Sequence, residues 1–151
     1  MKIYKTYKFR LYPNYTQEGK LNSFLGCKRF IYNYYLTKKL ENNNLTVYEL
    51  KKDLPNLQID KPWLKEIDGS ILRTTLDDLE NAFSRYQKGL SEKPHYKRYN
   101  DKQSYRTPYL KGIFKDKVYQ NIKLDLETRM IKLPKIEPIP IKGYRDYLWW
   151  W

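Results

Sequence analysis

Residues 70–90, with the sequence SILRTTLDDLENAFSRYQKGL, carry the clearest structural signal of the chain. Apolar side chains recur there at intervals of 4, 3, 4, 3 and 4 residues, at Leu72, Leu76, Leu79, Phe83, Tyr86 and Leu90. This spacing predicts a helix that begins at Ser70 and buries one face in a core. Arg73 falls on the opposite face near the positive N-terminal end of the helix, where it is a candidate phosphate-binding residue.

The sequence before this helix predicts a helix-turn-helix. Thr16 can cap a first helix, and Gly26 marks a turn. Residues 27–36 then continue at helical spacing, with a buried stripe expected at Phe30, Ile31, Tyr34 and Tyr35. Two short helices around a glycine have the helix-turn-helix shape.

A further short helix is predicted after the polar loop 41–44. Thr46 and Glu49 have the spacing of a capping box, in which each side chain satisfies the other residue's backbone N–H. We expect this helix to end by Pro55, since proline removes a helical hydrogen bond. Trp63 and Leu64 then begin another turn.

Strands are predicted at both ends of the chain. Residues 3–13 alternate apolar or aromatic residues with basic ones, which is typical of a half-buried strand with Tyr7, Phe9 and Leu11 on one face. Lys8 and Arg10 then lie on the other face. Three further short strands are expected at 118–124, 130–134 and 136–141, so the predicted fold class is α+β.

The positive charge of the chain lies at its two ends. The 151 residues hold 30 Lys and Arg against 17 Asp and Glu, a formal charge of +13. Residues 1–40 carry +8, residues 41–92 carry −3 and residues 93–151 carry +8. If the ends meet in the fold, they build one basic surface. Because aromatic residues make up 17% of the chain, stacking on bases is available as well, and nucleic acid is favoured over a merely basic globular protein.

Several classes of function lack the residues that they need. The single cysteine, Cys27, excludes an internal disulfide and a zinc site built from cysteines. His95 is the only histidine, which leaves no histidine-based metal site or Ser/His/Asp triad. We therefore expect no cofactor and no metal. The sequence shows neither a secretion signal nor an apolar run long enough to cross a membrane, which predicts a cytoplasmic protein.

The carboxylates of the long helix do not predict an active site. Asp77, Asp78 and Glu80 are adjacent or nearly so, and such positions on a helix point apart. Arg73 and Lys88 lie near enough in the sequence to neutralise them. The prediction is a solvated helical face.

Basic and aromatic residues make up a candidate nucleic-acid-binding set. Lysine and arginine can hold phosphates, arginine can read guanine edges, and tyrosine can stack on bases. The members are Lys8, Arg10, Lys28, Arg29, Tyr32, Asn33, Arg73, Lys97, Arg98, Tyr105 and Arg106.

An ordered series of motifs resembles the N-terminal half of OrfB/TnpB proteins, which insertion sequences encode and which are relatives of type V CRISPR effectors. The resemblance covers about residues 4–145. Its motifs are the runs 7–14, 26–34, 63–64 followed by 72–83, 104–107 and 131–135.

The resemblance implies an architecture and a set of partners. The first strand would join the C-terminal strands in a small antiparallel β-barrel, the wedge domain, and whether this barrel is complete is left open. The helices would form a recognition lobe. The implied boundaries are 1–13 and 93–145 for the wedge, 14–92 for the recognition lobe and 146–151 for an atypical tail. Such proteins bind a structured guide RNA and double-stranded DNA. Arg73 and Thr107 would read a duplex motif, while Lys8, Arg10 and Arg106 would hold backbone.

The resemblance also predicts that this chain is not an enzyme by itself. The family's RuvC-like nuclease domain lies further downstream, and residues 146–151 end in three tryptophans that do not match the family. We expect a truncated form with an exposed edge strand near 136–141. A nuclease-bearing partner chain is left open.

Two alternatives remain at the level of sequence. One is a stand-alone helix-turn-helix regulator whose helix 27–36 enters the major groove, with Lys28, Arg29 and Asn33 on base edges. The other is a decayed transposase fragment with no function, which would unfold without cooperativity.

Overall fold

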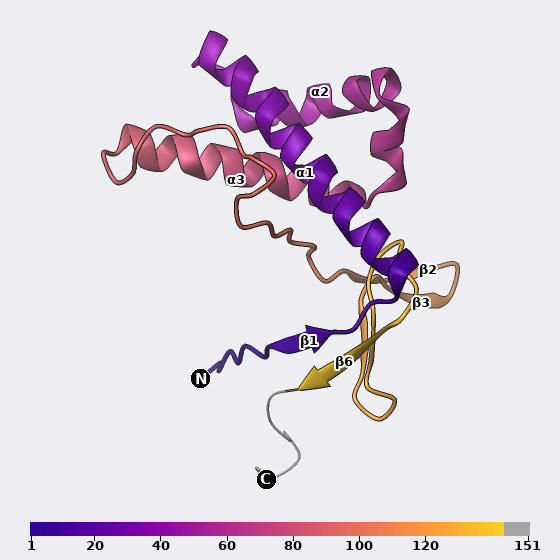
Figure 1. Ribbon diagram of the computed structural model, residues 1–151. Helices are drawn as coiled ribbons and strands as arrows, with labels where there is room; N and C mark the ends of the chain where they lie inside the picture. Colours follow the sequence, from indigo (N-terminus) through magenta and orange to yellow (C-terminus); the bar gives the residue numbers. More distant parts are fainter. Residues whose placement is uncertain (144–151) are drawn as a thin grey trace. The chain divides into compact units, whose positions relative to one another are not determined.

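The computed structural model describes residues 1–143, which belong to two compact units. The sheet unit consists of residues 1–20 and the chain from residue 109 onward, and the helical unit consists of residues 21–108. Helix α1 begins in the sheet unit and continues into the helical unit (Figure 1). Residues 146–151, predicted to be an atypical tail, lie outside the described residues.

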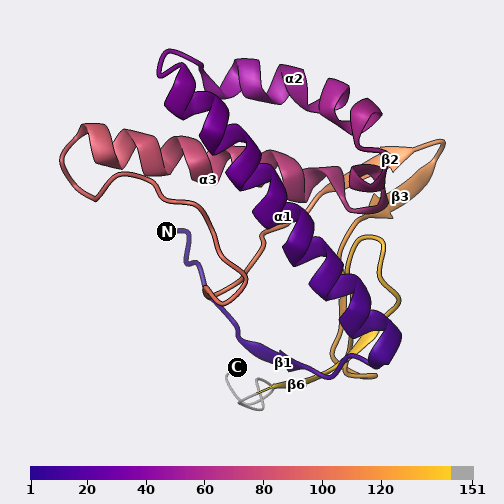
Figure 2. The ribbon, with the colours of Figure 1, turned by 45° about the horizontal axis from the view of Figure 1, so that its top comes forward.

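The helical unit is built from three α-helices and one short 3-10 helix. Their bounds are Tyr15–Glu41 for α1, Val47–Asp60 for α2, Pro62–Glu66 for η1 and Gly69–Gln87 for α3. α1 crosses α3 in two different views (Figures 1 and 2). None of the described helices is both long enough and apolar enough to cross a membrane.

The predicted stripe of α3 forms the centre of the helical core. Four of its six members are 0–4% exposed, namely Leu72, Leu76, Leu79 and Phe83. The stripe ends there, since Tyr86 and Leu90 are 43% and 65% exposed. Asp68 caps the helix by accepting a hydrogen bond from the backbone N–H of Ser70. The long amphipathic helix is therefore confirmed, although its buried face ends at Phe83, about two turns before the predicted end at Leu90.

The predicted turn at Gly26 is wrong, because α1 is one continuous helix of 27 residues. Phe24 and Ile31, on either side of this glycine, are both buried. Burying the two halves together outweighs the roughly 1 kcal/mol by which glycine disfavours a helix. The predicted cap is also displaced, since Asn14, not Thr16, exchanges two hydrogen bonds with Gln17 at the start of α1.

The capping box of α2 is confirmed, whereas its predicted end is wrong. Thr46 accepts from the backbone N–H of Glu49, whose carboxylate accepts from the backbone N–H of Thr46. Pro55 lies inside the helix on its exposed side. The hydrogen bond lost there is outweighed by the burial of side chains on both sides of it, at Leu50, Leu54 and Leu57.

The sheet unit contains a four-stranded antiparallel sheet in the order β1-β6-β5-β4. The bounds are Phe9–Leu11 for β1, Lys123–Asp125 for β4, Met130–Lys132 for β5 and Ile139–Gly143 for β6. A separate hairpin joins β2, Lys111–Phe114, to β3, Lys117–Gln120. The predicted strand 118–124 is thus divided between β3 and β4, and β2 was missed. No closed barrel is formed by residues 1–143.

The two ends of the described chain meet in this sheet. Phe9 pairs with Gly143 and Leu11 with Ile141, so the predicted strands at opposite ends of the sequence are neighbours. β6 lies between β1 and β5 and buries Ile139 and Ile141. The expected exposed edge near 136–141 is therefore wrong, because both neighbours of β6 are present.

We expect Leu72→Ala to lower the free energy of unfolding by about 2–5 kcal/mol, because it opens a cavity in a fully packed core. Leu90→Ala is the matched control, and its 65% exposed side chain should change stability by less than about 0.5 kcal/mol. Urea unfolding followed by circular dichroism measures both. Equal effects, or a parent chain without a cooperative transition, would contradict the packed core.

The capping box should make stability depend on pH. Hydrogen bonds from the backbone and then the side chain of Thr46 lower the pKa of Glu49. Its stabilising effect is therefore complete above the ordinary glutamate pKa of about 4.3 and is lost as pH falls through the lower folded value. We expect the parent to exceed Glu49→Gln in stability at pH 7 and this difference to shrink by pH 3. A difference that grows toward low pH would show that the carboxylate does not cap α2.

Candidate nucleic-acid interface

A segment without helix or strand, residues 93–108, passes over α1 and α3 within the helical unit; we call it the strap. It contains four members of the predicted binding set, Lys97, Arg98, Tyr105 and Arg106, together with Thr107, which the resemblance assigns to reading a duplex motif. The backbone N–H and C=O groups of the strap have no helix or sheet in which to form hydrogen bonds. Side chains of the two helices supply these partners instead. These contacts decide which predicted binding residues are available.

α1 holds the strap through polar side chains, of which Asn33 and Lys28 bond to its backbone. The Asn33 amide donates to the carbonyl of Lys97 at 2.9 Å and accepts from the N–H of Lys97 at 2.8 Å. Lys28 Nζ donates to the carbonyl of Ser104 at 2.8 Å and lies 3.2 Å from a carboxylate oxygen of Asp78. Asn33 and Lys28 were both predicted to contact nucleic acid. In this structure their polar groups have partners within the protein.

α3 holds the other end of the strap. Asp78 pairs with Arg106 as well as with Lys28, so one carboxylate joins α1, α3 and the strap. Thr74 Oγ1 donates to the carbonyl of Arg106 at 3.1 Å. The hydroxyl of Thr107 donates to the carboxylate of Asp68 at 2.9 Å. The start of α3 and the end of the strap therefore lie together.

The predicted partners of the α3 carboxylates are wrong, although the three side chains remain 30–44% exposed. Asp77 pairs with Lys51 of α2, and Glu80 pairs with Lys39 of α1. Lys39 is 3% exposed, so its ammonium group is withdrawn from water, whereas the side chain of Glu80 is 38% exposed. The partners come from other elements of the fold rather than from Arg73 and Lys88 of the same sequence stretch.

Two of the candidate stacking tyrosines are covered. Tyr32 is 5% exposed, and the ammonium group of Lys97 lies 5.1 Å from the centre of its ring. The ring of Tyr105 packs edge-on against Phe24, with 6.2 Å between the ring centres. Burial raises the pKa of both phenols. They support the strap and offer little ring surface to a base.

Several cationic side chains of α3 and the strap are exposed to solvent. Arg73 is exposed on the first turns of α3, and Lys102 is exposed on the strap. The side chains of Arg98 and Arg106 are 82% and 60% exposed, although each also pairs with a carboxylate. Arg73, Arg106 and Thr107 belong to the region where α3 starts and the strap ends. The structure thus brings these three predicted residues together.

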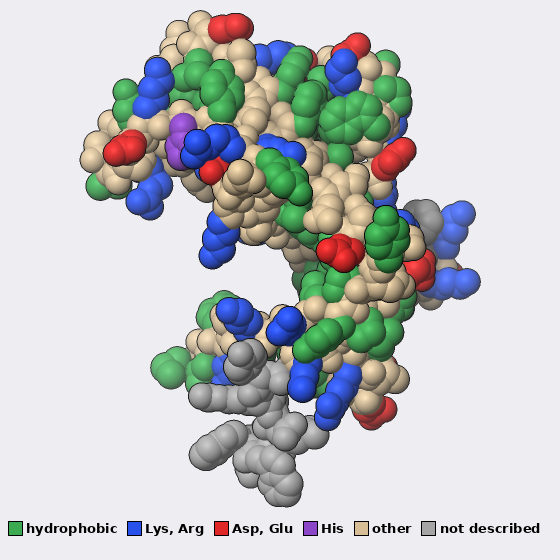
Figure 3. All heavy atoms as spheres, in the orientation of Figure 1, with side chains coloured by type: hydrophobic (Ala, Val, Ile, Leu, Met, Phe, Trp, Pro, Cys, Tyr) green, Lys and Arg blue, Asp and Glu red, His purple; other side chains and the backbone are tan. Residues whose placement is uncertain are grey.

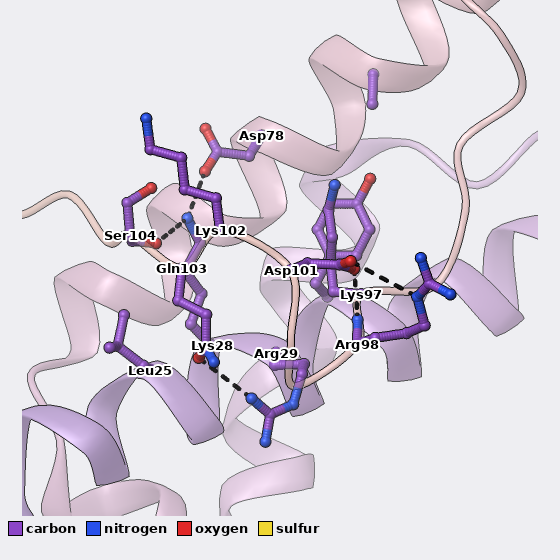
Figure 4. A pocket seen from close by; sticks show the side chains of 12 residues that line it. Leu25, Lys28, Arg29, Asp78, Lys97, Arg98, Asp101, Lys102, Gln103 and Ser104 are labelled. Carbon is purple, nitrogen blue, oxygen red and sulfur yellow. Dashed lines mark hydrogen bonds and ion pairs between the residues drawn. The ribbon is translucent and has the colours of Figure 1, made fainter.

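The strap, α1 and α3 enclose a cleft of about 280 Å³ (Figure 4). Its lining includes Lys28 and Arg29 from α1, Asp78 from α3, and Lys97 and Arg98 from the strap. Figure 4 shows the Lys28 ammonium group between Asp78 and Ser104, and the Arg29 guanidinium group beside Gln103. Five cations and two carboxylates line the cleft, which gives it a net positive charge.

The sheet unit is the more basic of the two. Its described residues hold 13 Lys and Arg against 5 Asp and Glu. In the register of the sheet, Arg10 lies opposite Lys142 and Lys123 opposite Lys132. Figure 3 shows Lys and Arg side chains, in blue, beside hydrophobic ones, in green, on this unit.

These basic pairs lie on the face of the sheet that does not form its core. Leu11 pairs with Ile141 and Ile131 with Ile139, so the alternate positions Arg10, Lys142 and Lys132 point the other way. Tyr12 joins them, since the guanidinium group of Arg10 lies 5.5 Å from its ring centre. Lys8 is exposed just before β1. The expectation that Lys8 and Arg10 face away from the core agrees with their exposure.

Several residues at these surfaces escaped the sequence analysis. The roles of Asp78 and Gln103 were missed because Lys28, Arg29 and Arg106 lie far from them in the sequence, where no spacing rule connects them; Asp101 pairs with Arg98 only three residues away and was missed all the same. Lys132 could have been found, since it alternates with Ile131 and Leu133 in the predicted strand 130–134, whereas Lys142 lies one residue beyond the predicted strand 136–141. Within residues 1–143, no three His, Cys, Asp or Glu side chains are grouped as a metal site.

Comparison with known sequences finds two similarities, the first of them at the start of the chain. Residues 1–43 match the helix-turn-helix domain of OrfB/IS605-type proteins. In the structure this range holds β1, the whole of α1 and the first residues of the following loop. The turn expected inside it at Gly26 is absent, and the first turn between helices follows Glu41.

A second similarity extends over most of the chain. InsQ of Escherichia coli (strain K12), a protein named for an RNA-guided DNA endonuclease activity, is 27% identical over 147 residues. The aligned region covers 90% of this chain and 33% of InsQ, so the chain spans about a third of that relative's length. The chain thus carries an N-terminal helix-turn-helix domain of the OrfB/IS605 type and is a distant homologue of InsQ.

Proposed function

We propose that this chain is the nucleic-acid-binding part of a TnpB-type, RNA-guided system that binds a structured guide RNA and double-stranded DNA. The observation that carries the proposal is the convergence of Arg73, Arg106 and Thr107 from two separate elements onto one exposed region. The name of InsQ and its similarity to this chain support the RNA-guided assignment. The positive charge of both units supplies the attraction to phosphates.

The two units would have different roles. We assign guide-RNA backbone binding to the basic sheet face, with Lys8 and Arg10 among its contacts. We propose residues 1–13 and 93–145 as the wedge, of which the strap packs against α1 and α3 of the helical unit. The helices within residues 14–92 would form the recognition lobe, where Arg73 reads a duplex motif from the exposed side of α3. Thr107 would assist at the same place, because its hydroxyl is fixed on Asp68.

The stand-alone regulator is the weaker proposal. It needs Lys28, Arg29 and Asn33 to reach base edges from α1, and all three donate hydrogen bonds to the strap. Residues 31, 32, 35 and 36 of the same helix segment are buried. A helix covered by the strap on one side and by the core on the other presents few groups to a major groove.

Binding without cleavage is part of the proposal. We expect the purified chain to bind nucleic acid without cutting it, with cutting assigned to a nuclease domain in the same system. Incubation with plasmid and Mg²⁺ or Mn²⁺ tests this directly. Cleavage by the purified chain would overturn this part of the proposal. A cytoplasmic location follows from the proposed role and stays a prediction.

Affinity for nucleic acid should fall steeply with salt. Each phosphate contact contributes about −0.9 for duplex DNA, or about −0.7 for a single strand, to the slope of log affinity against log salt concentration. With at least five cations engaged, we expect a slope of about −4 or steeper for a 20-base-pair duplex, measured by fluorescence anisotropy between 50 and 300 mM NaCl. An affinity that does not change with salt would contradict phosphate binding by the basic surfaces.

Arg73→Ala should reduce sequence preference more than total affinity. A base contact by arginine is worth about 1–3 kcal/mol of discrimination, whereas one lost phosphate contact weakens all duplexes alike. Arg85→Ala, in the last turn of the same helix, is the matched control because it removes the same exposed charge. Selection from a randomised duplex library measures the preference. Identical profiles for the two variants would remove Arg73 from the reading surface.

A further inference from the structure

A second hollow of the helical unit, with a volume of about 460 Å³, lies along α1; we call it the α1 groove. Gly26, Phe30, Tyr34 and Thr37 line it at intervals of three or four residues, and such positions share one face of a helix. Tyr96 of the strap lines it as well, and its hydroxyl oxygen lies 3.1 Å from that of Thr37. The groove is therefore formed by one face of α1 together with the strap.

Two aromatic rings lie together in the α1 groove. The rings of Phe30 and Tyr34 are stacked, with 5.9 Å between their centres and an angle of 25° between their planes. Trp63 of η1 packs edge-on against Phe30, with 5.0 Å between the ring centres. Phe30 and Tyr34 are nevertheless only half-buried. The groove thus presents aromatic surface that neighbouring side chains hold in place, which suits a flat ring as ligand.

Gly26 keeps part of the α1 groove open. A Cβ at this position would meet no atom within 4 Å, so the space beside it belongs to no other part of the described chain. Its φ is not positive, and glycine disfavours a helix relative to alanine. Neither packing nor backbone conformation therefore calls for glycine here. A ligand seated against the backbone of α1 would, because any side chain at this position would stand in its way.

The chemistry of the α1 groove favours a nucleic-acid strand over a peptide. Arg29 lines it and no acidic side chain is among its described lining residues, so its charge complements an anion. The guanidinium group of Arg29 donates to Gln103 at 3.2 Å and has further N–H donors. The backbone groups of α1 are bonded within the helix, so an extended peptide would find few main-chain partners there. A base needs only the faces of rings.

We propose that the α1 groove binds single-stranded nucleic acid, with a base against the rings of Phe30 and Tyr34 and the sugar–phosphate backbone passing over Gly26. The inference rests on the proposed function and deepens it, because it assigns an unpaired stretch of the bound nucleic acid to a surface that does not include Arg73. Stacking of this kind tolerates any base, so the groove adds affinity without sequence preference.

Two single strands of equal charge measure the contribution of the bases. Labelled octathymidylate and an abasic octamer with the same sugar–phosphate backbone are titrated with the protein, and binding is followed by fluorescence anisotropy at constant ionic strength. We expect the parent to bind octathymidylate at least about fivefold more tightly than the abasic octamer, because each stacked base adds affinity. Equal affinities for the two octamers would overturn the inference.

Gly26→Leu tests the groove without changing the net charge. The new side chain should lower the affinity for octathymidylate to that for the abasic octamer, while the melting temperature stays the same or rises because leucine favours helix. Gly19→Leu is the matched control, since Gly19 is exposed on α1 outside the groove and a Cβ there also meets no atom within 4 Å. It should leave octathymidylate binding unchanged. Parental affinity in the folded Gly26→Leu variant would overturn the inference.

Tyr34→Leu tests the aromatic surface and keeps the inference testable where Gly26→Leu disturbs folding. We expect it to weaken octathymidylate binding by about fivefold and to leave abasic binding unchanged. Tyr48→Leu, which removes a 73% exposed ring from α2, should change neither. Circular dichroism verifies that both variants are folded. Equal effects of the two substitutions on octathymidylate binding would place the stacking outside the groove and overturn the inference.

The same preparations distinguish this inference from the proposed function. Anisotropy with a 20-base-pair duplex and a structured RNA measures binding by the whole basic surface, and Gly26→Leu should leave duplex affinity unchanged because paired bases are not free to enter the groove. Salt-dependent binding to these long probes, with equal affinities for the two octamers, would overturn only the groove assignment. Base-dependent octamer binding that Gly26→Leu abolishes, without binding to either long probe, would overturn the proposed function and leave the groove as a single-strand site.

Discussion

Burial of one face of α3 is the constraint on which the helical unit depends. Leu72, Leu76 and Leu79 are fully buried, so α3 cannot rotate about its own axis without exposing these side chains. With this face fixed, the carboxylates on its flanks point in defined directions. Asp77 and Glu80 meet lysines of α2 and α1, which sets the position of those helices relative to α3. Asp78 is then directed at the strap.

Polar contacts, rather than apolar burial, hold most of the strap. A single hydrogen bond contributes on the order of 1 kcal/mol, so the strap is stable only because several act together along its length. The carboxylate of Asp78 partly neutralises the charges of Lys28 and Arg106. The side chains of Lys97 and Lys102 form no ion pair among the described residues and keep their positive charge. The same segment can thus be ordered by α1 and α3 and still present positive charge to an anion.

The errors of the sequence analysis share one physical cause. Gly26 and Pro55 disfavour helix locally, and both lie inside helices because flanking side chains are buried on each side. The supposed edge strand near 136–141 is interior because β1, more than a hundred residues earlier, pairs with it. In each case a contact between distant residues outweighs a local preference of about 1–3 kcal/mol.

Periodicity and capping chemistry determined much of this protein from sequence alone. The α3 stripe, the Thr46–Glu49 box, the alternation of β1 and the concentration of basic charge at the chain ends are all local or additive properties. Tertiary structure alone decided which charges are available. Lys28 and Asn33 looked like surface groups, yet they hold the strap, while Lys102 and Arg29 line a cleft. Pairing of side chains with groups 64–76 residues away depends on packing, which no spacing rule describes.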